Sequence, residues 1–175
     1  MTFSNPAAVA AASAGAYVRA LLDVLGDRDP LQVLAELEGW LDRRFAGVPS
    51  AAVERPEAPG KWSAADVVHH LADSELVFGF RMRMILTEDR PAIQGYDQDK
   101  WATTLRYPVV PLVESRVQLR TLRAANLRVL KGLGPAEMDR VGMHSERGPE
   151  SLGHLTKLMA AHDLVHRRQI DRVLK

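Results

Sequence analysis

Hydrophobic residues recur along this chain with the three- and four-residue spacing of helices, and strand-like alternation is nearly absent. Asn5-Pro6 and Asp29-Pro30 are typical helix starts, because a capping side chain precedes a proline in the first turn, and Gly26 is a typical stop. The pattern predicts five helices, at about 6–25, 30–45, 63–87, 111–133 and 151–175. The fold class is therefore expected to be all-α.

The connections between these helices differ in length. Ser63 and Asp66 form a capping-box pattern that opens the long third helix. The loop after that helix, roughly 88–110, is long enough to indicate function, and a short helix is expected inside it at 97–105. This long connection also indicates that the second and third helices of the bundle are not simple antiparallel neighbours. The segment 139–150 is expected to be irregular.

Composition limits the kind of protein. The 175 residues show no internal repeat and no linker, so we expect a single helical-bundle domain over 1–175. With 23 basic and 22 acidic side chains, the chain has no bulk attraction for nucleic acid or membranes, and neither is expected as a partner. The Ala-rich N-terminus lacks a basic region, and no apolar run is long enough to cross a bilayer, so a cytoplasmic location is expected.

Two histidines in the last predicted helix suggest metal chemistry. His162 and His166 are four residues apart and therefore lie on one helix face. That face also carries apolar residues, namely Leu155, Met159, Ile170 and Val173. Two imidazoles directed at a core need polar partners, and a divalent metal ion is a partner that both can share. Ordinary core or surface histidines are the alternative.

A third histidine lies in the helix predicted at 63–87. His70 shares its face with Val67, Val77 and Phe78, so it is expected to point inward, whereas His69 is expected to point outward beside Asp66 and Asp73. His70, His162 and His166 would then form a three-imidazole metal site, with positions left open for water or substrate. The chain has no cysteine, so a metal must be bound through nitrogen and oxygen, and any thiol must come from outside.

A family resemblance adds to this reasoning. The run from Gly60 to Glu75, GKWSAADVVHHLADSE, resembles the Lys-Trp-Ser…His-Leu-x-(Asp/Asn)-x-Glu signature of the DinB/YfiT-like superfamily, and His162-x-x-x-His166 resembles its second signature. The resemblance covers about 29–175 as the core, with 1–28 as an N-terminal helical addition.

The resemblance implies a four-helix bundle of up-down-down-up connectivity, often a homodimer. It also implies a divalent metal ion, zinc or nickel, bound by His70, His162 and His166. Better-understood relatives join a low-molecular-weight thiol to an electrophile. Imidazole ligands by themselves suit zinc, nickel, copper and iron alike.

Other polar residues are candidates for roles around such a site. Glu75, His144 and Glu146 are candidate catalytic residues, the last two from a turn that resembles a His-Pro-Glu-x-Gly turn of some relatives, with Ser145 in place of proline. Asp163 is a further candidate proton carrier, and Gln169 is one of several possible partners for a ligating imidazole. In the long loop, Tyr96, Gln98 and Trp101 are candidate pocket walls, although Trp101 could equally fill the core.

These observations predict a metal-dependent enzyme in which a bound thiol or water becomes the nucleophile. The leading hypothesis is transfer of a low-molecular-weight thiol to a small-molecule electrophile. Metal-dependent hydrolysis is the alternative within the enzyme class. A non-catalytic, metal-stabilised helical dimerisation protein is the alternative outside it.

Overall fold

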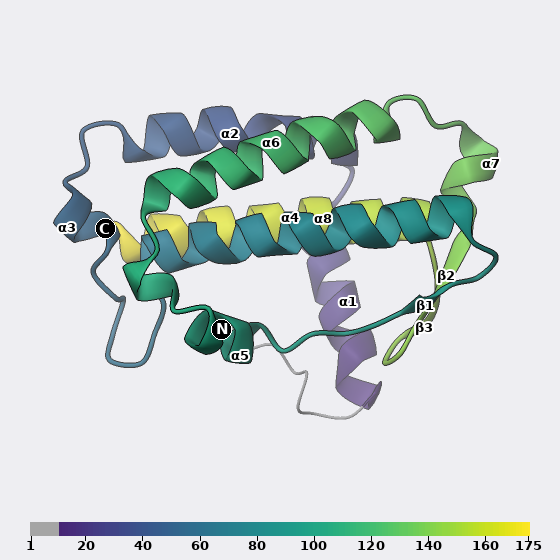
Figure 1. The fold of residues 1–175 in the computed structure, drawn as a ribbon, viewed down its shortest axis with the longest axis horizontal. Helices are drawn as coiled ribbons and strands as arrows, with labels where there is room; N and C mark the ends of the chain where they lie inside the picture. The colour runs from purple at the N-terminus through teal and green to yellow at the C-terminus, as the bar shows by residue number, and fades with distance from the viewer. Residues whose placement is uncertain (1–10) are drawn as a thin grey trace.

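The computed structural model describes residues 11–175, with side chains from residue 15 onward. Most of this range is helical (Figure 1). The elements in chain order are α1 (Ala11–Leu25), α2 (Pro30–Phe45), α3 (Ser50–Val53), α4 (Ala64–Thr87), β1 (Ala92–Ile93), α5 (Gln98–Thr104), the 3-10 helix η1 (Tyr107–Val109), α6 (Leu112–Leu130), α7 (Pro135–Met138), β2 (Val141–His144), β3 (Gly148–Ser151) and α8 (Leu152–Val173).

The predicted helix starts are formed by the expected capping residues. Asp29 accepts hydrogen bonds from the backbone N–H groups of Leu31 and Gln32 at the start of α2. At the start of α4, the Asp66 N–H donates to Ser63 Oγ over 3.1 Å, and the Ser63 N–H donates to Asp66 Oδ2 over 2.9 Å. The capping box is thus confirmed. The predicted start at Asn5 lies outside the described residues.

Hydrogen-bonded pairs give the directions of the four long helices. His69 of α4 pairs with Ser115 of α6, and further along both helices Glu75 pairs with Arg123. The two helices, α4 and α6, therefore run in the same direction. In Figure 1, α2 and α8 run in the opposite direction to α4 and α6. The four long helices therefore follow one another as up, down, down, up, and the long 88–111 connection returns the chain to the end at which α4 began.

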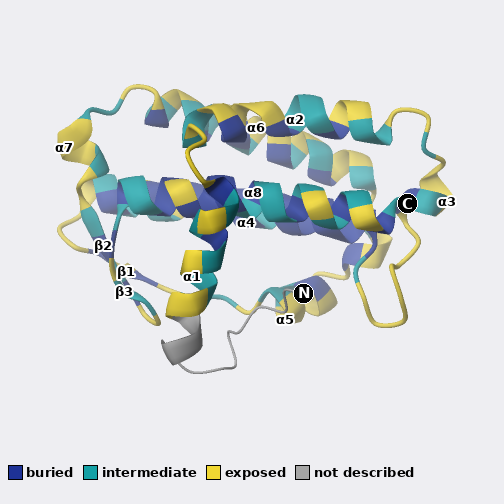
Figure 2. Cartoon of the chain, turned by 180° about the vertical axis from the view of Figure 1, so that it is seen from behind, coloured by how far each residue is buried: buried dark blue, intermediate teal, exposed yellow. Residues whose placement is uncertain are grey.

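The helices are arranged in layers around a central pair. α2 and α6 cover α4 and α8 on one side, and α1, α5 and the small sheet lie on the other side (Figure 1). Buried positions are concentrated along α4 and α8 (Figure 2). Because α4 contacts α6 as well as α8, it is buried on most of its surface.

The burial of α4 makes the prediction for His69 wrong. His69 is only 4% exposed, and its Nδ1 is hydrogen-bonded to Ser115 Oγ. The ring of Tyr107 also packs on it, with 5.6 Å between ring centroids. The sequence stripe containing His69 looks polar because it faces α6 and η1, which supply polar partners, rather than solvent.

A three-stranded sheet replaces the irregular segment predicted at 139–150. β2 and β3 form an antiparallel hairpin joined by the turn 145–147. Gly148 begins β3 with φ of +78°, and β1 pairs with β2 in parallel. A Cβ at Gly142 would lie 2.2 Å from Ile93 Cδ1, so only glycine permits this close packing. The strands have two to four residues each, which is too short for an alternating pattern to be recognised.

One smaller difference and one agreement complete the comparison. The loop expected at 49–60 contains the single-turn helix α3, and the short helix expected at 97–105 is present as α5. Across residues 11–175, no helix combines the length and the apolarity that a membrane span requires.

Candidate metal centre

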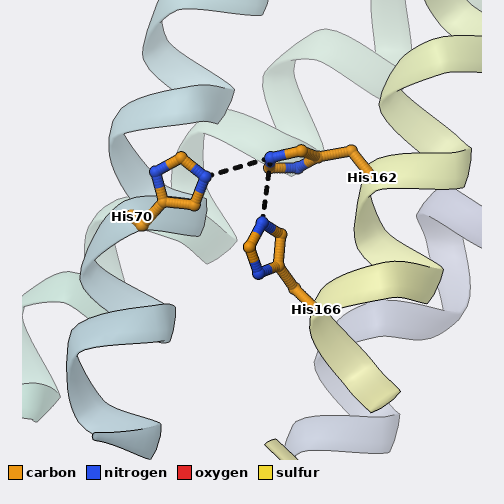
Figure 3. Close-up of side chains that lie close together, drawn as sticks. All are labelled: His70, His162 and His166. Carbon is orange, nitrogen blue, oxygen red and sulfur yellow. Dashed lines mark hydrogen bonds between the residues drawn. The ribbon is translucent and has the colours of Figure 1, made fainter. Parts of the chain in front are cut away.

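Three histidines meet where α4 crosses α8. His70 lies in the second turn of α4, and His162 and His166 lie on consecutive turns of α8 (Figure 3). The two helices run antiparallel, so a histidine near the start of one faces two histidines in the second half of the other. His70 is 1% and His166 8% exposed.

The three rings direct the same nitrogen atom at one point. The Nε2 atom of His162 lies 3.0 Å from Nε2 of His70 and 3.1 Å from Nε2 of His166. Zinc binds imidazole nitrogen at about 2.0–2.1 Å, so two ligands on one tetrahedral ion are about 3.3–3.4 Å apart. The observed Nε2–Nε2 spacings are slightly shorter and close to those of neighbouring ligands in one coordination sphere.

The surroundings keep these imidazoles neutral. Burial lowers the pKa of His162 to about 4, with a smaller effect of the Arg123 charge. Burial and then His162 lower the pKa of His166 to about 3. The pKa of His70 is also well below its usual range, because of burial and then the two other rings. Neutral imidazoles have the free lone pair that a metal needs.

One partner fixes the orientation of His166. The Nδ1 atom of His166 lies 2.8 Å from Gln169 Oε1, an acceptor, so Nδ1 carries the hydrogen and Nε2 the lone pair. Ser74 Oγ lies 3.4 Å from His70 Nε2, and the Trp62 ring packs on the His70 ring with 5.0 Å between centroids. Nδ1 of His70 and Nδ1 of His162 are buried without a hydrogen-bond partner among the described residues.

Glu75 and Asp163, two candidate proton carriers, belong to a separate buried cluster. Arg123 donates to Glu75 Oε2 over 2.8 Å, to Asp163 Oδ2 over 2.7 Å and to the Leu34 carbonyl over 2.7 Å. Asn126 donates to Glu75 Oε1 over 2.8 Å. We call Glu75, Arg123, Asn126 and Asp163 the ion-pair cluster. Both carboxylates are ion-paired with Arg123, so this residue of α6 links α6 to α4 and to α8.

A large cavity opens on the His166 side of the cluster. It has a volume of about 800 Å³, and Trp62, His166 and Gln169 form part of its wall. Four basic side chains also line it, namely Lys61, Arg106, Arg168 and Arg172. Arg106 adopts a left-handed conformation with φ of 57°, which is rare outside glycine and is found at sites where the fold imposes a conformation.

A smaller cavity of about 140 Å³ lies on the His162 side. His162 lines it together with the candidate residues His144 and Glu146 of the hairpin, so these candidates share a cavity with one histidine of the cluster. Tyr96 lines this cavity, and Gln98 lines both cavities. Trp101 lines neither, but its ring packs on Tyr96 with 4.6 Å between centroids.

Several residues near the site escaped the sequence analysis. Arg81 lines the small cavity. It lies seven positions after Ser74 on the same, mostly inward-facing side of its helix, and a charged residue on that face could have indicated a role at the site. Tyr17, from α1, lines both cavities, which gives the N-terminal helix a place in the site. No pattern linked Arg123 to its partners, because they come from separate helices.

Comparison with known proteins identifies the family. A family model described as the DinB superfamily matches residues 33–170, so the chain belongs to the DinB superfamily. The matched range includes all three histidines and excludes α1.

Relatives in the family have names that refer to metal. A protein of Oceanobacillus iheyensis, named "Putative metal-dependent hydrolase OB0782", is 32% identical over 116 residues, which cover 66% of this chain and 67% of that protein. A Bacillus mycoides protein with the same kind of name is 29% identical over 140 residues, or 80% of each chain.

A solved structure has the same fold. YfiT from Bacillus subtilis, described as "a probable metal-dependent hydrolase with an unusual four-helix bundle topology", matches with a TM-score of 0.76 and 26% identity over 82% of this chain and 83% of that chain. The chain is thus a DinB-type helical bundle. The names of the relatives and the convergent histidines together support a divalent metal site.

Proposed function

We propose that this protein is a metal-dependent enzyme that joins a low-molecular-weight thiol to a small electrophile. The observation that supports it best is the pair of unequal cavities, about 800 and 140 Å³, that adjoin the histidine cluster on its His166 and His162 sides. A reaction between two different molecules needs two adjoining sites, one on each side of the reacting centre.

His70, His162 and His166 would hold the ion, and their chemistry fits it. Three neutral imidazoles with convergent lone pairs form a stable arrangement around a cation, and three ligands leave positions for other molecules. Zinc and nickel both accept such ligands. When bound, a divalent ion lowers the pKa of a thiol or a water molecule and so makes a nucleophile at neutral pH.

The large cavity is the proposed thiol site. Its volume lies within the range of small-molecule sites, about 300–1,000 Å³. Of its basic residues, Arg172 is paired with Glu57, whereas Lys61, Arg106 and Arg168 form no ion pair with described residues. Two carboxylates, Asp66 and Asp99, line the cavity besides Glu57, so the basic side chains outnumber the acidic ones by one. We take this small excess to favour a thiol that carries an anionic group. The thiol must be a separate molecule, because the chain contains no cysteine.

Metal-dependent hydrolysis is the second candidate, and the names of the relatives favour it. It would need only one of the two cavities, because water is the other reactant. The two candidates therefore differ in one observable property, the requirement for an added thiol.

The metal site is tested first, by elemental analysis of protein purified without an affinity metal. We expect about one divalent ion per chain, zinc or nickel, in the wild type and none in His166→Ala, with helicity retained. His154→Ala is the control, because His154 lies on the same helix and lines neither cavity. Metal that survives His166→Ala would contradict the assignment. Sedimentation of the same samples tests the expected homodimer.

The reaction is then tested with cysteine and chloroacetate as probes. In the transfer, a carbon–sulfur bond forms, chloride leaves with the electron pair, and the thiol proton goes to solvent. Thiol-dependent chloride release, lost in His166→Ala, is the expected result. Chloride release at the same rate without thiol would establish hydrolysis, with glycolate as the product. Release in neither case, by metal-loaded protein, would leave the transfer proposal refuted for this electrophile class.

A further inference from the structure

The small cavity has one apolar and one polar wall. Val18 and Leu21 of α1 and Leu158 of α8 belong to the apolar wall. The polar wall carries side chains that can donate hydrogen bonds, namely Ser74, Arg81, Tyr96 and His144. Sites with a mostly apolar lining and a few polar groups are typical of small organic ligands, which the polar groups orient.

The size of the cavity restricts what can enter. Its volume is about 140 Å³. An engineered apolar cavity of about 150 Å³ in another protein accommodates benzene, so this cavity holds a molecule of roughly six non-hydrogen atoms. An amphipathic molecule of that size has one short apolar part and one polar group.

The hydrogen-bonding state of His144 follows from its contacts. The backbone N–H of Glu146 donates to His144 Nδ1 over 3.2 Å, so Nδ1 is an acceptor and carries no hydrogen. Burial, and then the charge of Arg147, lower the pKa of His144 to about 4, so the ring is neutral at pH 7. The hydrogen is therefore on Nε2, which makes this atom a donor.

That donor has no partner among the described residues. His144 is 4% exposed, and its Nε2 is buried without an acceptor among residues 15–175. A buried donor without an acceptor costs about 1–3 kcal/mol, and a ligand that supplies an acceptor removes this cost. The ring borders the cavity, so a ligand there is the nearest source of an acceptor.

The sheet fixes the position of His144. Its register pairs His144 with Ile93 of β1 and with Gly148 of β3. Ser145 adds two bonds, since its N–H donates to the Ile93 carbonyl over 2.9 Å and its Oγ accepts from the Gly95 N–H over 3.2 Å. A proline at this position could form neither bond, so serine ties the hairpin to the loop that carries Tyr96.

Arg81 adds a positive charge to the same wall. Its guanidinium donates to the Gln94 carbonyl and lies 6.0 Å from the centre of the Tyr96 ring. Within the described residues it forms no ion pair, while Arg147, the other arginine at this cavity, is paired with Glu150. The carboxylate of Glu146 also lines the cavity, and Glu146 and Glu150 interact electrostatically with Arg81 without forming an ion pair with it. The guanidinium of Arg81 favours an acceptor with negative charge or a strong dipole.

We propose that the small cavity binds a short organic molecule through a carboxylate or carbonyl oxygen, which accepts a hydrogen bond from His144 Nε2 and faces Arg81. The apolar end of the molecule lies against α1, outside the range that the family model matches. If the bound molecule is the electrophile of the thiol transfer, this inference rests on the proposed function. Binding itself requires no reaction.

The experiment uses propionate as the probe and metal-free, full-length protein at pH 7, observed by NMR of the histidine side chains. We expect His144 to carry its hydrogen on Nε2 and to show saturable shifts as propionate is added. In His144→Phe the Kd for propionate should rise about tenfold or more, the effect of one hydrogen bond to a charged acceptor. His154→Phe should leave the Kd unchanged, and Val18→Trp, which fills the cavity, should abolish binding.

Several outcomes would overturn the inference. They are a hydrogen on Nδ1 of His144, no saturable shift with propionate, or an unchanged Kd in His144→Phe. Failure here is distinct from failure of the proposed function. Protein that binds metal and consumes thiol but ignores propionate keeps the function and loses this inference. Protein that binds propionate but no metal keeps this inference and loses the proposed function.

Discussion

Two buried polar clusters both include residues of α4 and α8, and they differ in how completely their atoms are paired. The ion-pair cluster also includes two residues of α6. In the ion-pair cluster, Arg123 donates to Glu75, to Asp163 and to a backbone carbonyl. Asn126 donates to the other oxygen of Glu75. In the histidine cluster, the Nε2 atoms converge on one another, although His166 donates its hydrogen to Gln169, so at most two hydrogens remain for the three Nε2 atoms.

This difference indicates that the ion-pair cluster is structural and that the histidine cluster is a binding site. A saturated cluster has nothing to offer a ligand, and its bonds fix how α6 packs on the central pair. A cluster of convergent lone pairs favours a cation, and cavities adjoin it on two sides. Asp163 directly follows His162 in α8. Adjacent residues of this helix therefore belong to different clusters, His162 to the histidine cluster and Asp163 to the ion-pair cluster.

The largest expected effect comes from breaking the ion-pair cluster. Arg123→Met leaves the carboxylates of Glu75 and Asp163 buried without their cation, so the free energy of unfolding should fall by about 3–5 kcal/mol. Thermal and urea unfolding of metal-free protein measure this loss. By contrast, His162→Ala in the same assay should cost less, because it removes no charge partner.

The matched control for Arg123→Met removes the carboxylates as well. In the triple variant with Glu75→Leu and Asp163→Leu no charge is left without a partner, and we expect it to recover much of the lost stability. A triple variant less stable than Arg123→Met would show that the loss comes from packing and not from uncompensated charge.

The second prediction concerns the affinity of the histidine cluster. Removing one of three ligands in His70→Ala should weaken zinc binding by more than the about 10- to 100-fold that loss of a supporting hydrogen bond costs. Competition with a chromogenic chelator measures the affinity. His69→Ala on the neighbouring position is the control, because His69 faces Ser115 instead of the cluster. Equal weakening in the two variants would contradict the assignment.

The sequence predicted the helices and the histidine cluster because both depend on local spacing. His162 and His166 share a face through helix geometry alone, and the inward direction of His70 followed from its apolar neighbours. His69 was predicted incorrectly, because a single stripe cannot show that a second helix covers it. The ion-pair cluster was missed for a similar reason, since its members are up to 88 positions apart in the chain, from Glu75 to Asp163.

The third prediction tests the hydrogen bond between His166 and Gln169. Gln169 is the acceptor that holds His166, so Gln169→Leu should weaken zinc binding by about 10- to 100-fold while the three ligands remain. Gln169→Glu keeps an acceptor oxygen and should bind zinc nearly as well as the wild type. The same chelator competition measures both variants. Equal affinities in Gln169→Leu and Gln169→Glu would show that the hydrogen bond has no role in binding.

The smallest expected effect is a pH dependence of stability due to His144. The folded pKa is about 4 and the unfolded value is about 6.5, so the unfolded chain binds more protons between these values. Acidification from pH 7 toward 4 therefore destabilises the wild type, by at most about 1.4 kcal/mol per pH unit for one group. The charged groups around His144 are Arg81 on α4 and Arg147, Glu146 and Glu150 on the hairpin.

His144→Phe isolates this contribution, because the other groups titrate alike in both proteins. The difference in Tm, wild type minus variant, should decrease as the pH falls from 7 to 5 in metal-free protein. His154→Phe is the comparison variant outside both cavities. If the Tm difference for His144→Phe stays constant over this range, His144 is not held neutral by burial. Its pKa would then be the same in the folded and unfolded chains. A difference that instead grows as the pH falls would show a partner that stabilises the charged ring, and His144 would then not present an uncharged N–H donor to the small cavity.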